Sequence, residues 1–543
     1  MDRVIIDGRS LTIKKVALAA RFGAQVALDS EAEKRMSASR AVVDRCVDEE
    51  LVRYGITTGF GKFCDVVISK DENALLQRNL IMSHACGVGE PLPAEVVRAV
   101  ALLRANALAV GYSGIRPSTV RALVDLLNAG VVPVVPEKGS LGASGDLAPL
   151  SHLVLVLMGL GEAFYKGVRM GGAHALAAAG LEPVTLAAKE GLALINGTQV
   201  MTAIGALACF DARKLLRTAD LAAALSAQAL GGIVDAYDPR VHELRRQDGQ
   251  IASAASLRAL LSGSRLTSRQ GELRVQDAYA LRCVPQIHGA SRDAVDYVSR
   301  IVENELGAVT DNPLILPEDL EAGFSGGAAR RGAADAPEAG ADLGADIISG
   351  GNFHGQPVAL AMDFLGIALA ELASISERRV ERLVNPSLSN GLPAFLSSNG
   401  GLNSGFMITQ YVAAALVSEN KVLAHPASVD SIPSSANQED HVSMGTIAAR
   451  KARSILENLQ HVLAIEILAA CQAIDLGAHA GRPGAEGLSP ATAAAHKLVR
   501  SVVPPLGPDR VMYPDIEAVR ALVAEGSLVR AAADRAGASA EVD

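Results

Sequence analysis

The segment Gly139–Leu150 (GSLGASGDLAPL) holds the residues whose types and order say most about chemistry. Its glycines and small side chains predict a turn in front of a helix, with Ser144 or Asp146 as the N-cap. A phosphate-binding loop is a second interpretation, but the GxxxxGK[ST] pattern is absent. The GxSxG nucleophile elbow does not match either, because Gly145 directly follows Ser144. Taken alone, the segment leaves a plain turn and a functional site equally open.

The tripeptide Ala143-Ser144-Gly145 offers a third, covalent possibility. If the backbone is compressed there, the amide nitrogen of Gly145 reaches the carbonyl carbon of Ala143, since glycine has no Cβ to obstruct the approach. Loss of one water closes a five-membered ring, and dehydration of the Ser144 side chain leaves an exocyclic methylidene. The product is a 4-methylidene-imidazol-5-one (MIO), an electrophile that no ordinary side chain supplies. Surroundings that fix the bend can hold such strain at a site.

Further motifs of this kind occur along nearly the whole chain. They are Tyr54–Gly61, Asn79–Pro91, Leu194–Gln199 (LINGTQ), Gln276–Cys283 (QDAYALRC), Thr310–Pro313 (TDNP), Gly350–Pro357 (GGNFHGQP) and Asn437–Gly445 (NQEDHVSMG). Together with Gly139–Leu150, and in this order, they resemble the aromatic amino-acid ammonia-lyase family, which includes histidine, tyrosine and phenylalanine lyases and the related aminomutases. The resemblance implies a carbon–nitrogen lyase that forms its MIO autocatalytically from Ala143, Ser144 and Gly145 and needs no external cofactor.

Elimination of ammonia also needs a base close to the β-carbon of the substrate. The resemblance implies that Tyr54 is this base. A phenol is mostly protonated near neutral pH, so backbone amides, the polar MIO ring or a helix N-terminus must stabilise the phenolate. The glycines that follow Tyr54 favour a lid loop that closes to exclude water. The alternative is a loop tyrosine that only packs on the body of the protein.

Arg282 is the predicted ligand of the substrate carboxylate, since a planar guanidinium binds two oxygens at once. Gln276, Tyr279 and Arg282 are three residues apart, so they share one face if the segment is helical. An ordinary ion pair is the default for a lone arginine, but the family pattern Q-x-x-Y-x-x-R favours function, with Tyr279 catalytic and Gln276 at the substrate. The resemblance assigns further contacts around the MIO, the amine and the substrate pocket to Asn196, Gln438 and Phe353.

Two residues are expected to select the ring of the substrate. An imidazole at His84 binds a phenol hydroxyl or another imidazole, and a buried polar group rejects substrates that lack a matching group. Phenylalanine is therefore disfavoured. The Glu439 carboxylate can accept a hydrogen bond from an imidazole N–H, which is the arrangement that resemblance to histidine lyases implies.

The surrounding motifs favour tyrosine slightly over histidine. Met82–Gly87 (MSHACG), Pro285–Ser291 (PQIHGAS) and Phe353–Pro357 (FHGQP) look more like some bacterial tyrosine lyases. Histidine lyases more often read FHAEP at the last of these, so Gly355-Gln356 departs from their pattern. We therefore expect conversion of L-tyrosine to trans-p-coumarate, with an accompanying activity on L-histidine left open. A histidine ammonia-lyase that forms trans-urocanate is the first alternative, followed by a tyrosine 2,3-aminomutase and a non-catalytic relative on the same scaffold.

The elements that must position these residues are mainly helical. The longest runs of strong helix formers are Ala94–Leu108, Ala203–Leu230, Val358–Leu383 and Ile447–Ile474. Signals for strands are few, and Val4–Ile6 with Leu11–Ile13 predicts a small hairpin. We predict a mainly α fold with a long central helix bundle of the fumarase/aspartase-like class, which the resemblance implies, and a loop-rich N-terminal part.

We expect three consecutive regions. Residues 1–200 form the domain that carries the MIO and the lid loop, residues 201–480 the long-helix bundle, and residues 481–543 a C-terminal helical segment with a frayed tail. Residues 321–346 are an Ala/Gly tract with almost no large apolar side chain. Such a tract cannot bury enough surface to offset its ordering entropy, so we predict a mobile insertion.

Composition limits the partners of the chain. Its 543 residues are 49% hydrophobic, which suffices for a large core. A net charge of −9, 3% aromatic residues and no tryptophan argue against a nucleic-acid partner. The six cysteines form no CxxC pair and no HExxH is present, so we predict neither disulfides nor a metal site.

The expected setting follows from the same sequence. No uninterrupted apolar run reaches the ~18 residues of a membrane span, and the N-terminus lacks the plan of a signal peptide. We therefore expect a cytoplasmic protein with no membrane partner. The resemblance implies a homotetramer whose active sites are shared between subunits, with a small aromatic amino acid as the substrate.

Overall fold

The computed structural model describes residues 3–59, 61–63, 65–318, 320, 343–479 and 483–536. The chain forms two compact units, each assembled from several segments. The first unit comprises Met1–Leu207, Ser299–Met362 and Pro426–Arg450, and the second unit Ala208–Val298, Asp363–His425 and Lys451–Asp543. The predicted boundary at residue 200 lies near the end of the first segment. The predicted boundary at residue 480 has no counterpart, because the second unit continues through it.

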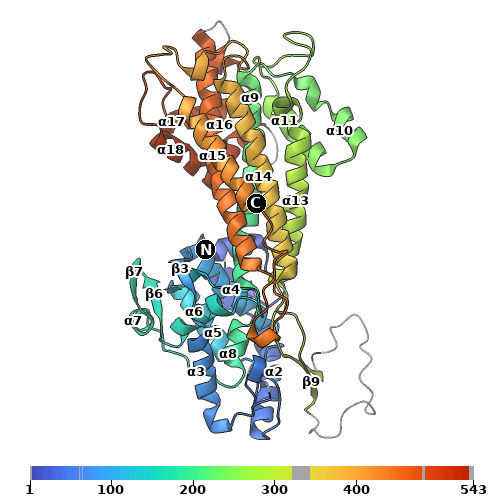
Figure 1. Cartoon of the computed structure of the whole chain (residues 1–543), viewed down its shortest axis with the longest axis vertical. Coiled ribbons are helices and arrows are strands. Elements are labelled where there is room, and N and C mark those ends of the chain that lie inside the picture. Colours follow the sequence, from blue (N-terminus) through green and yellow to red (C-terminus); the bar gives the residue numbers. More distant parts are fainter. Residues whose placement is uncertain are drawn as a thin grey trace. The chain divides into compact units, whose positions relative to one another are not determined.

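The first unit combines helices with several small sheets (Figure 1). Its elements are β1 (Arg3–Ile6), α1 (Ile13–Ala20), β2 (Gln25–Leu28), α2 (Ser30–Asp48), η1 (Gly61–Phe63), η2 (Lys70–Glu72), α3 (Asn73–His84), β3 (Val88–Pro91), α4 (Ala94–Ala109), α5 (Pro117–Ala129), β4 (Val132–Pro133), β5 (Pro136–Lys138), α6 (Leu147–Leu157), β6 (Glu162–Tyr165), β7 (Val168–Gly171), α7 (Gly172–Ala178), α8 (Glu190–Ile195), β8 (Leu314–Pro317), β9 (Ala345–Ile348) and η6 (Ser435–Asn437).

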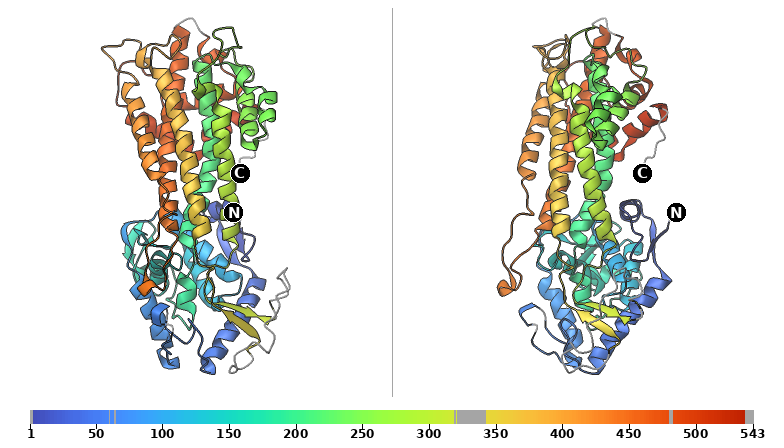
Figure 2. Two further views of the ribbon diagram at one scale, coloured as in Figure 1. Left: turned by 45° about the vertical axis from the view of Figure 1, so that its right-hand side comes forward. Right: turned by 90° about the vertical axis from the view of Figure 1, so that its right-hand side faces the viewer.

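The second unit is a bundle in which long helices run side by side (Figures 1 and 2). Its own elements are η3 (Val234–Tyr237), α10 (Pro239–Arg245), α11 (Asp248–Leu261), α12 (Tyr279–Arg282), η5 (Ala394–Leu396), α15 (Met407–Leu423), η7 (Gly484–Gly487), α17 (Pro490–Val502), α18 (Tyr513–Glu525) and α19 (Ser527–Ala536). Four longer helices contribute residues to both units: α9 (Gln199–Ala229), α13 (Val284–Leu306), α14 (Gln356–Val384) and α16 (Gly445–His479).

The long runs of helix formers are confirmed as α4, α9, α14 and α16, with ends within a few residues of those predicted. The predicted hairpin is wrong. Strand β1 pairs in parallel with β2, and the expected second strand instead turns into helix α1 at Ile13. The reason is the N-cap: the Thr12 side chain accepts a hydrogen bond from the Lys15 amide, which starts a helix whose apolar face is buried.

A buried ionic network sets the alignment of four helices within the second unit. Arg379 of α14 forms a bidentate salt bridge with Glu466 of α16, in which Nε donates to Oε1 at 2.6 Å and Nη2 donates to Oε2 at 2.9 Å. His288 of α13 bonds through Nδ1 to Asp220 of α9 at 2.8 Å, and all four side chains are fully buried. Removing one member would leave a buried charge without its partner, so the network favours one registry of the bundle.

The predicted mobile insertion, residues 321–346, falls mostly outside the described residues. Its last residues are described: Leu343 is buried, and Ala345 begins β9, which pairs antiparallel with β8. The described residues at the end of the predicted insertion therefore belong to packed structure. Residues 531–536 of the expected frayed tail are helical, because α19 continues to Ala536, and the rest of that tail lies outside the described residues.

Two helices are long and apolar enough to cross a membrane by length and composition alone, Gln356–Val384 and Gly445–Gly477. In their most apolar windows 67% and 83% of the residues are buried inside the protein. Core helices of globular proteins pass the same test, so these two helices are weak evidence for a membrane span.

Candidate active site

The turn around Ser144 has a backbone that small residues adopt. Ser144 and Gly145 have φ angles of +55° and +81°, and Gly142 pairs with Gly145 across the turn. A Cβ built on Gly145 would lie 2.2 Å from the carbonyl oxygen of Gly197. Glycine is therefore required at position 145 both by its φ angle and by the lack of space.

Asp146 fastens this turn to two helices. Its carboxylate is fully buried, and Oδ2 accepts from the backbone amides of Val200 and Met201, at 2.9 Å and 3.0 Å, in the first turn of α9. Oδ1 accepts from the hydroxyls of Ser140 and Thr446. Burial raises the pKa of Asp146, although these hydrogen bonds favour the carboxylate. The sequence predicts Ser144 or Asp146 as the N-cap of the helix that follows, and Asp146 occupies that position in α6. Its side chain, however, makes no cap hydrogen bond to α6 and instead caps α9.

Two predicted residues contact Ser144 directly. The side-chain amide of Asn196 donates to the Ser144 carbonyl oxygen at 2.9 Å, across 52 positions of sequence. The Ser144 hydroxyl donates to Oε1 of Glu439 at 3.2 Å, across 295 positions, and Oε2 of Glu439 accepts from the Ser434 hydroxyl at 3.0 Å. Motifs from three distant parts of the chain thus meet at the tripeptide.

His84 ends helix α3, which packs against α6 and α8. Its Nδ1 lies 2.9 Å from the carbonyl oxygen of Leu80, which can only accept, so Nδ1 carries the proton and Nε2 is left as an acceptor. Burial lowers the pKa of His84, while the Leu80 carbonyl and the negative charge of Glu439 oppose the shift. His84 is therefore a neutral imidazole near pH 7, within electrostatic reach of Glu439.

Tyr54 lies in a turn, and Gly61 of the same loop approaches the segment that carries Glu439. The Tyr54 hydroxyl accepts from the backbone amide of Gly61 at 3.4 Å, which is the kind of donor that a phenolate needs. A Cβ on Gly61 would lie 3.2 Å from the hydroxyl of Ser435, the first residue of η6. The Tyr54 loop and the Glu439 segment therefore approach each other within the first unit.

Gln276, Tyr279 and Arg282 lie in the second unit. The condition for one shared helix face is not met at Gln276, because α12 begins only at Tyr279. They still cluster: Arg282 Nη1 donates to Gln276 Oε1 at 2.9 Å, and the guanidinium lies 4.8 Å from the centre of the Tyr279 ring. The Tyr279 side chain is 69% exposed.

The two remaining predicted residues lie on loops. Phe353 is half-buried in the segment before α14, which Asn312 holds by accepting from the Gly350 amide at 2.8 Å. Gln438 is exposed, next to Glu439. Among the residues that the structure describes, no three His, Cys, Asp or Glu side chains gather as a metal site.

Comparison with known proteins identifies the family. A family model described as aromatic amino acid lyase matches residues 11–501. The chain belongs to the aromatic amino acid lyase family. A histidine ammonia-lyase of Alkaliphilus oremlandii is 59% identical over 531 residues, which make up 98% of this chain and 98% of that relative. Membership confirms the predicted carbon–nitrogen lyase and the mainly α fold.

Two solved structures of this family resemble the chain closely. A histidine ammonia-lyase from Trypanosoma cruzi has a TM-score of 0.86 at 45% identity, covering 98% of this chain and 96% of that one. A tyrosine aminomutase from Streptomyces globisporus has a TM-score of 0.90 at 38% identity, covering 100% of both chains. The fold alone therefore does not separate the substrates of this lyase family.

The predicted preference for L-tyrosine, with trans-p-coumarate as product, is contradicted. The relatives that are 55–59% identical to this lyase-family chain are histidine ammonia-lyases. One of the three motifs behind that preference contains Gly355-Gln356, and the structure gives each of these two residues a packing partner. A Cβ on Gly355 would lie 2.5 Å from the sulfur of Met201, and Gln356 Nε2 donates to the Ser428 carbonyl at 2.8 Å. A glutamate at position 356 has no proton to donate there.

This explanation predicts the behaviour of Gln356→Glu. We expect the variant to lose about 1 kcal/mol of unfolding free energy, because the Ser428 carbonyl loses its donor. The order of L-histidine, L-tyrosine and L-phenylalanine as substrates stays as in the wild type. Urea unfolding and initial rates on the three amino acids check both statements, and a changed order of substrates would make Gln356 a specificity residue after all.

Sequence reasoning missed Arg104, which supports the Asn196 segment. Arg104 is fully buried in α4, and its Nη1 donates to the carbonyl oxygens of Asn196 and Thr310, both at 3.1 Å, and to Oε1 of Gln199 at 2.8 Å. Burial lowers its pKa to about 10. The available signal is an arginine within the mostly apolar second half of α4, since a buried charge must have partners.

Proposed function

We propose that this chain is a histidine ammonia-lyase, which removes ammonia from L-histidine without oxidation or hydrolysis and releases trans-urocanate. The observation that carries the proposal is its identity of up to 59% to histidine ammonia-lyases, across 98% of its length. The geometry around Ser144 supports it independently, because the two residues expected to contact the substrate ring are suited to an imidazole.

His84 and Glu439 are the proposed ring-binding pair. His84 Nε2 is an acceptor because Nδ1 donates to Leu80, and the Glu439 carboxylate is also an acceptor. The imidazole of histidine carries one N–H donor when neutral and two when protonated, so the protonated ring offers one donor to each of them. A phenol offers a single donor and a phenyl ring none, so tyrosine bonds to at most one of the two acceptors and phenylalanine to neither.

We further propose that Ala143, Ser144 and Gly145 close into the MIO. The positive φ angles at Ser144 and Gly145 and the absence of a large side chain in the tripeptide fit that ring. The Asn196 amide is bonded to the Ser144 carbonyl oxygen, which is the oxygen that the ring would retain. Once formed, the ring supplies an electrophilic carbon that makes the amino group of the substrate a better leaving group.

The other predicted residues have roles in binding and proton transfer. Tyr54 takes the β-proton, with its phenolate stabilised by the Gly61 amide. Arg282 binds the carboxylate of the substrate, and its buried Nε has no hydrogen-bond partner among the described residues. Gln276 and Tyr279 orient the Arg282 guanidinium through the contacts already described. Phe353 and Gln438 complete the pocket from their loops.

The proposed assembly is a homotetramer with shared active sites, as in the family that the chain belongs to. Apolar side chains remain exposed on the long helices of the second unit, including Phe364 at 46%, Ile367 at 46% and Tyr411 at 57%. Exposed apolar surface of this kind is typical of a subunit interface. A neighbouring subunit could then present Arg282 to the Ser144 site.

The decisive experiment incubates the protein separately with L-histidine, L-tyrosine and L-phenylalanine and records the ultraviolet spectrum of each product. We expect urocanate from L-histidine and much slower reactions of the other two. Product analysis also separates a lyase from an aminomutase, which would return the ammonia and yield a β-amino acid. Faster release of p-coumarate from L-tyrosine would contradict the proposal.

His84→Phe tests the ring-binding pair. Removing the acceptor at position 84 should lower kcat/KM for L-histidine relative to L-phenylalanine by roughly 10²-fold, because a polar pocket rejects a mismatched ring far better than an apolar one. Ser83→Ala is the matched control, since it removes the neighbouring hydroxyl and leaves the imidazole in place. An unchanged ranking of the substrates in His84→Phe would remove His84 from the set of selecting residues.

A further inference from the structure

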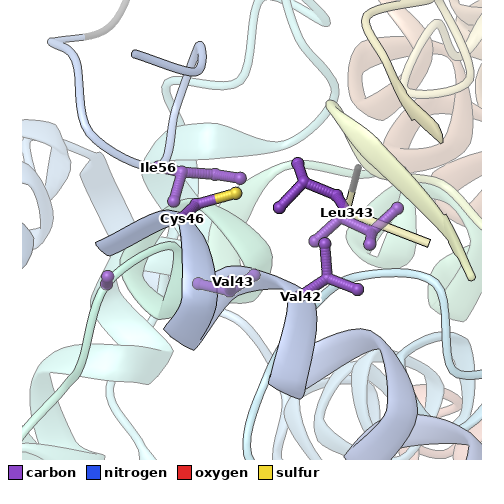
Figure 3. Packing of buried hydrophobic residues seen from close by; sticks show 7 residues of the cluster. Val42, Val43, Cys46, Ile56 and Leu343 are labelled. Atoms are coloured by element: carbon purple, nitrogen blue, oxygen red, sulfur yellow. The ribbon is translucent and has the colours of Figure 1, made fainter. Parts of the chain in front are cut away.

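The loop that carries Tyr54 has a buried anchor. The Ile56 side chain is fully buried and packs in a cluster with Val43, Cys46, Ile315 and Leu343, as Figure 3 shows for its labelled members. The backbone before Ile56 is equally constrained: Gly55 has a φ of +70°, and a Cβ there would lie 3.0 Å from Leu192 of α8. The loop is therefore seated on the body of the first unit at the two residues that follow Tyr54.

A chain of buried amides continues from this anchor. Asn73 Nδ2 donates to the Ile56 carbonyl at 3.4 Å, and Gln77 Nε2 donates to Asn73 Oδ1 at 3.2 Å. Gln77 Oε1 in turn accepts from the Gly191 amide at 2.9 Å. Asn73 and Gln77 are one helical turn apart on the buried face of α3, with 5% and 0% exposure.

The chain ends on the helix that leads to Asn196. Gly191 lies in the first turn of α8, whose C-cap is Asn196, and Asn196 holds the carbonyl of Ser144. A Cβ on Gly191 would lie 2.8 Å from Gln77 Oε1, so the close approach of helix and amide depends on glycine. The amides thus join the Tyr54 loop to the segment that contacts the reactive tripeptide.

Each position in this chain uses both the donor and the acceptor of its amide side chain. Gln77 must accept from one backbone and donate to its neighbour, and Asn73 must accept from Gln77 and donate to a carbonyl. A carboxylate cannot donate and an apolar side chain does neither. Neither residue touches Ser144 or the ring-binding pair through any described hydrogen bond, so a direct role in the chemistry is not needed to explain them.

We propose that Asn73 and Gln77 are positioning residues that fix Tyr54 relative to Asn196 and the Ser144 turn, which rests on the proposed role of Tyr54 as the base. Proton abstraction depends steeply on the distance between base and β-carbon. A loop released at Ile56 would therefore slow the removal of the β-proton and leave substrate binding and ring closure intact.

The test uses Gln77→Met, which keeps the length and helix propensity of the side chain and removes both hydrogen bonds. We expect kcat for L-histidine to fall by ~10-fold to 100-fold with little change in KM. The kinetic isotope effect measured with L-histidine deuterated at the β-carbon should rise above that of the wild type, because the proton transfer becomes slower than the other steps. The mass of the peptide with residues 143–145 should match the wild type.

Two further variants complete the experiment. Asn73→Asp keeps the acceptor for Gln77 and removes the donor to Ile56, so it should raise the isotope effect even if Gln77→Met folds poorly. Ile81→Val, at a fully buried position of the same helix, is the control for lost packing and should leave the isotope effect unchanged. A wild-type isotope effect in both amide variants would overturn the inference. If instead Tyr54→Phe is as active as the wild type, the proposed base is wrong.

Discussion

Ser144→Ala loses the elimination of ammonia from L-histidine, with kcat lower by at least ~10³-fold. Alanine has no hydroxyl to leave as water, so position 144 cannot provide the methylidene of the proposed ring. The loss is chemical and not structural, because Ser144 is only half-buried and alanine accepts the same backbone as serine. Urocanate formation followed by its absorbance measures the effect.

Ser144→Cys is the matched variant for this experiment. A thiol can leave as serine's hydroxyl does, so cyclisation and elimination still yield the same methylidene. We expect Ser144→Cys to keep substantial activity where Ser144→Ala has none. Equal activity of Ser144→Ala and the wild type would show that the tripeptide takes no covalent part in the reaction.

Tyr54→Phe is the second large effect. We expect kcat for L-histidine to fall by roughly 10²-fold to 10⁴-fold, the usual contribution of a positioned general base. KM should change little, since the hydroxyl accepts from Gly61 and is not assigned to the binding of the carboxylate or the ring. Steady-state kinetics over a range of pH checks the prediction and reveals the titration that disappears with the phenol.

A tyrosine of the second unit provides the control for Tyr54→Phe. Tyr513 at the start of α18 is 71% exposed, and Tyr513→Phe should retain wild-type kinetics. The peptide with residues 143–145 should have the wild-type mass in both variants, because neither hydroxyl is needed for ring closure. Wild-type kcat in Tyr54→Phe would assign the base to another residue.

The sequence predicts the site well where a motif and its neighbours carry the signal. Runs of helix formers locate α4, α9, α14 and α16, since propensity summed over many residues outweighs single exceptions. The structure also brings Asn196 and Glu439 into hydrogen-bond contact with Ser144, although Glu439 lies 295 positions from Ser144. That meeting follows from resemblance to a family and not from any local rule.

The features that the sequence does not predict are contacts between residues that lie far apart along the chain. Gly355 and Gln356 depart from the histidine-lyase pattern, and their contacts with Met201 and Ser428 are visible only in the structure. Gln276 lies before α12, which begins at Tyr279. This helix has only four residues, so the periodicity of the sequence cannot locate its start. The partner strand of β1 is also mispredicted. Strand β1 pairs in parallel with β2, and a parallel pair has no hairpin turn that the sequence could reveal.

The proposed elimination of ammonia depends most directly on closure of the ring at residues 143–145. Mass spectrometry of this peptide, taken from a preparation that is converting L-histidine to urocanate, measures it. We predict a peptide lighter than the encoded sequence by two water molecules, and the full mass in Ser144→Ala. An active preparation whose peptide keeps the full encoded mass would contradict the account.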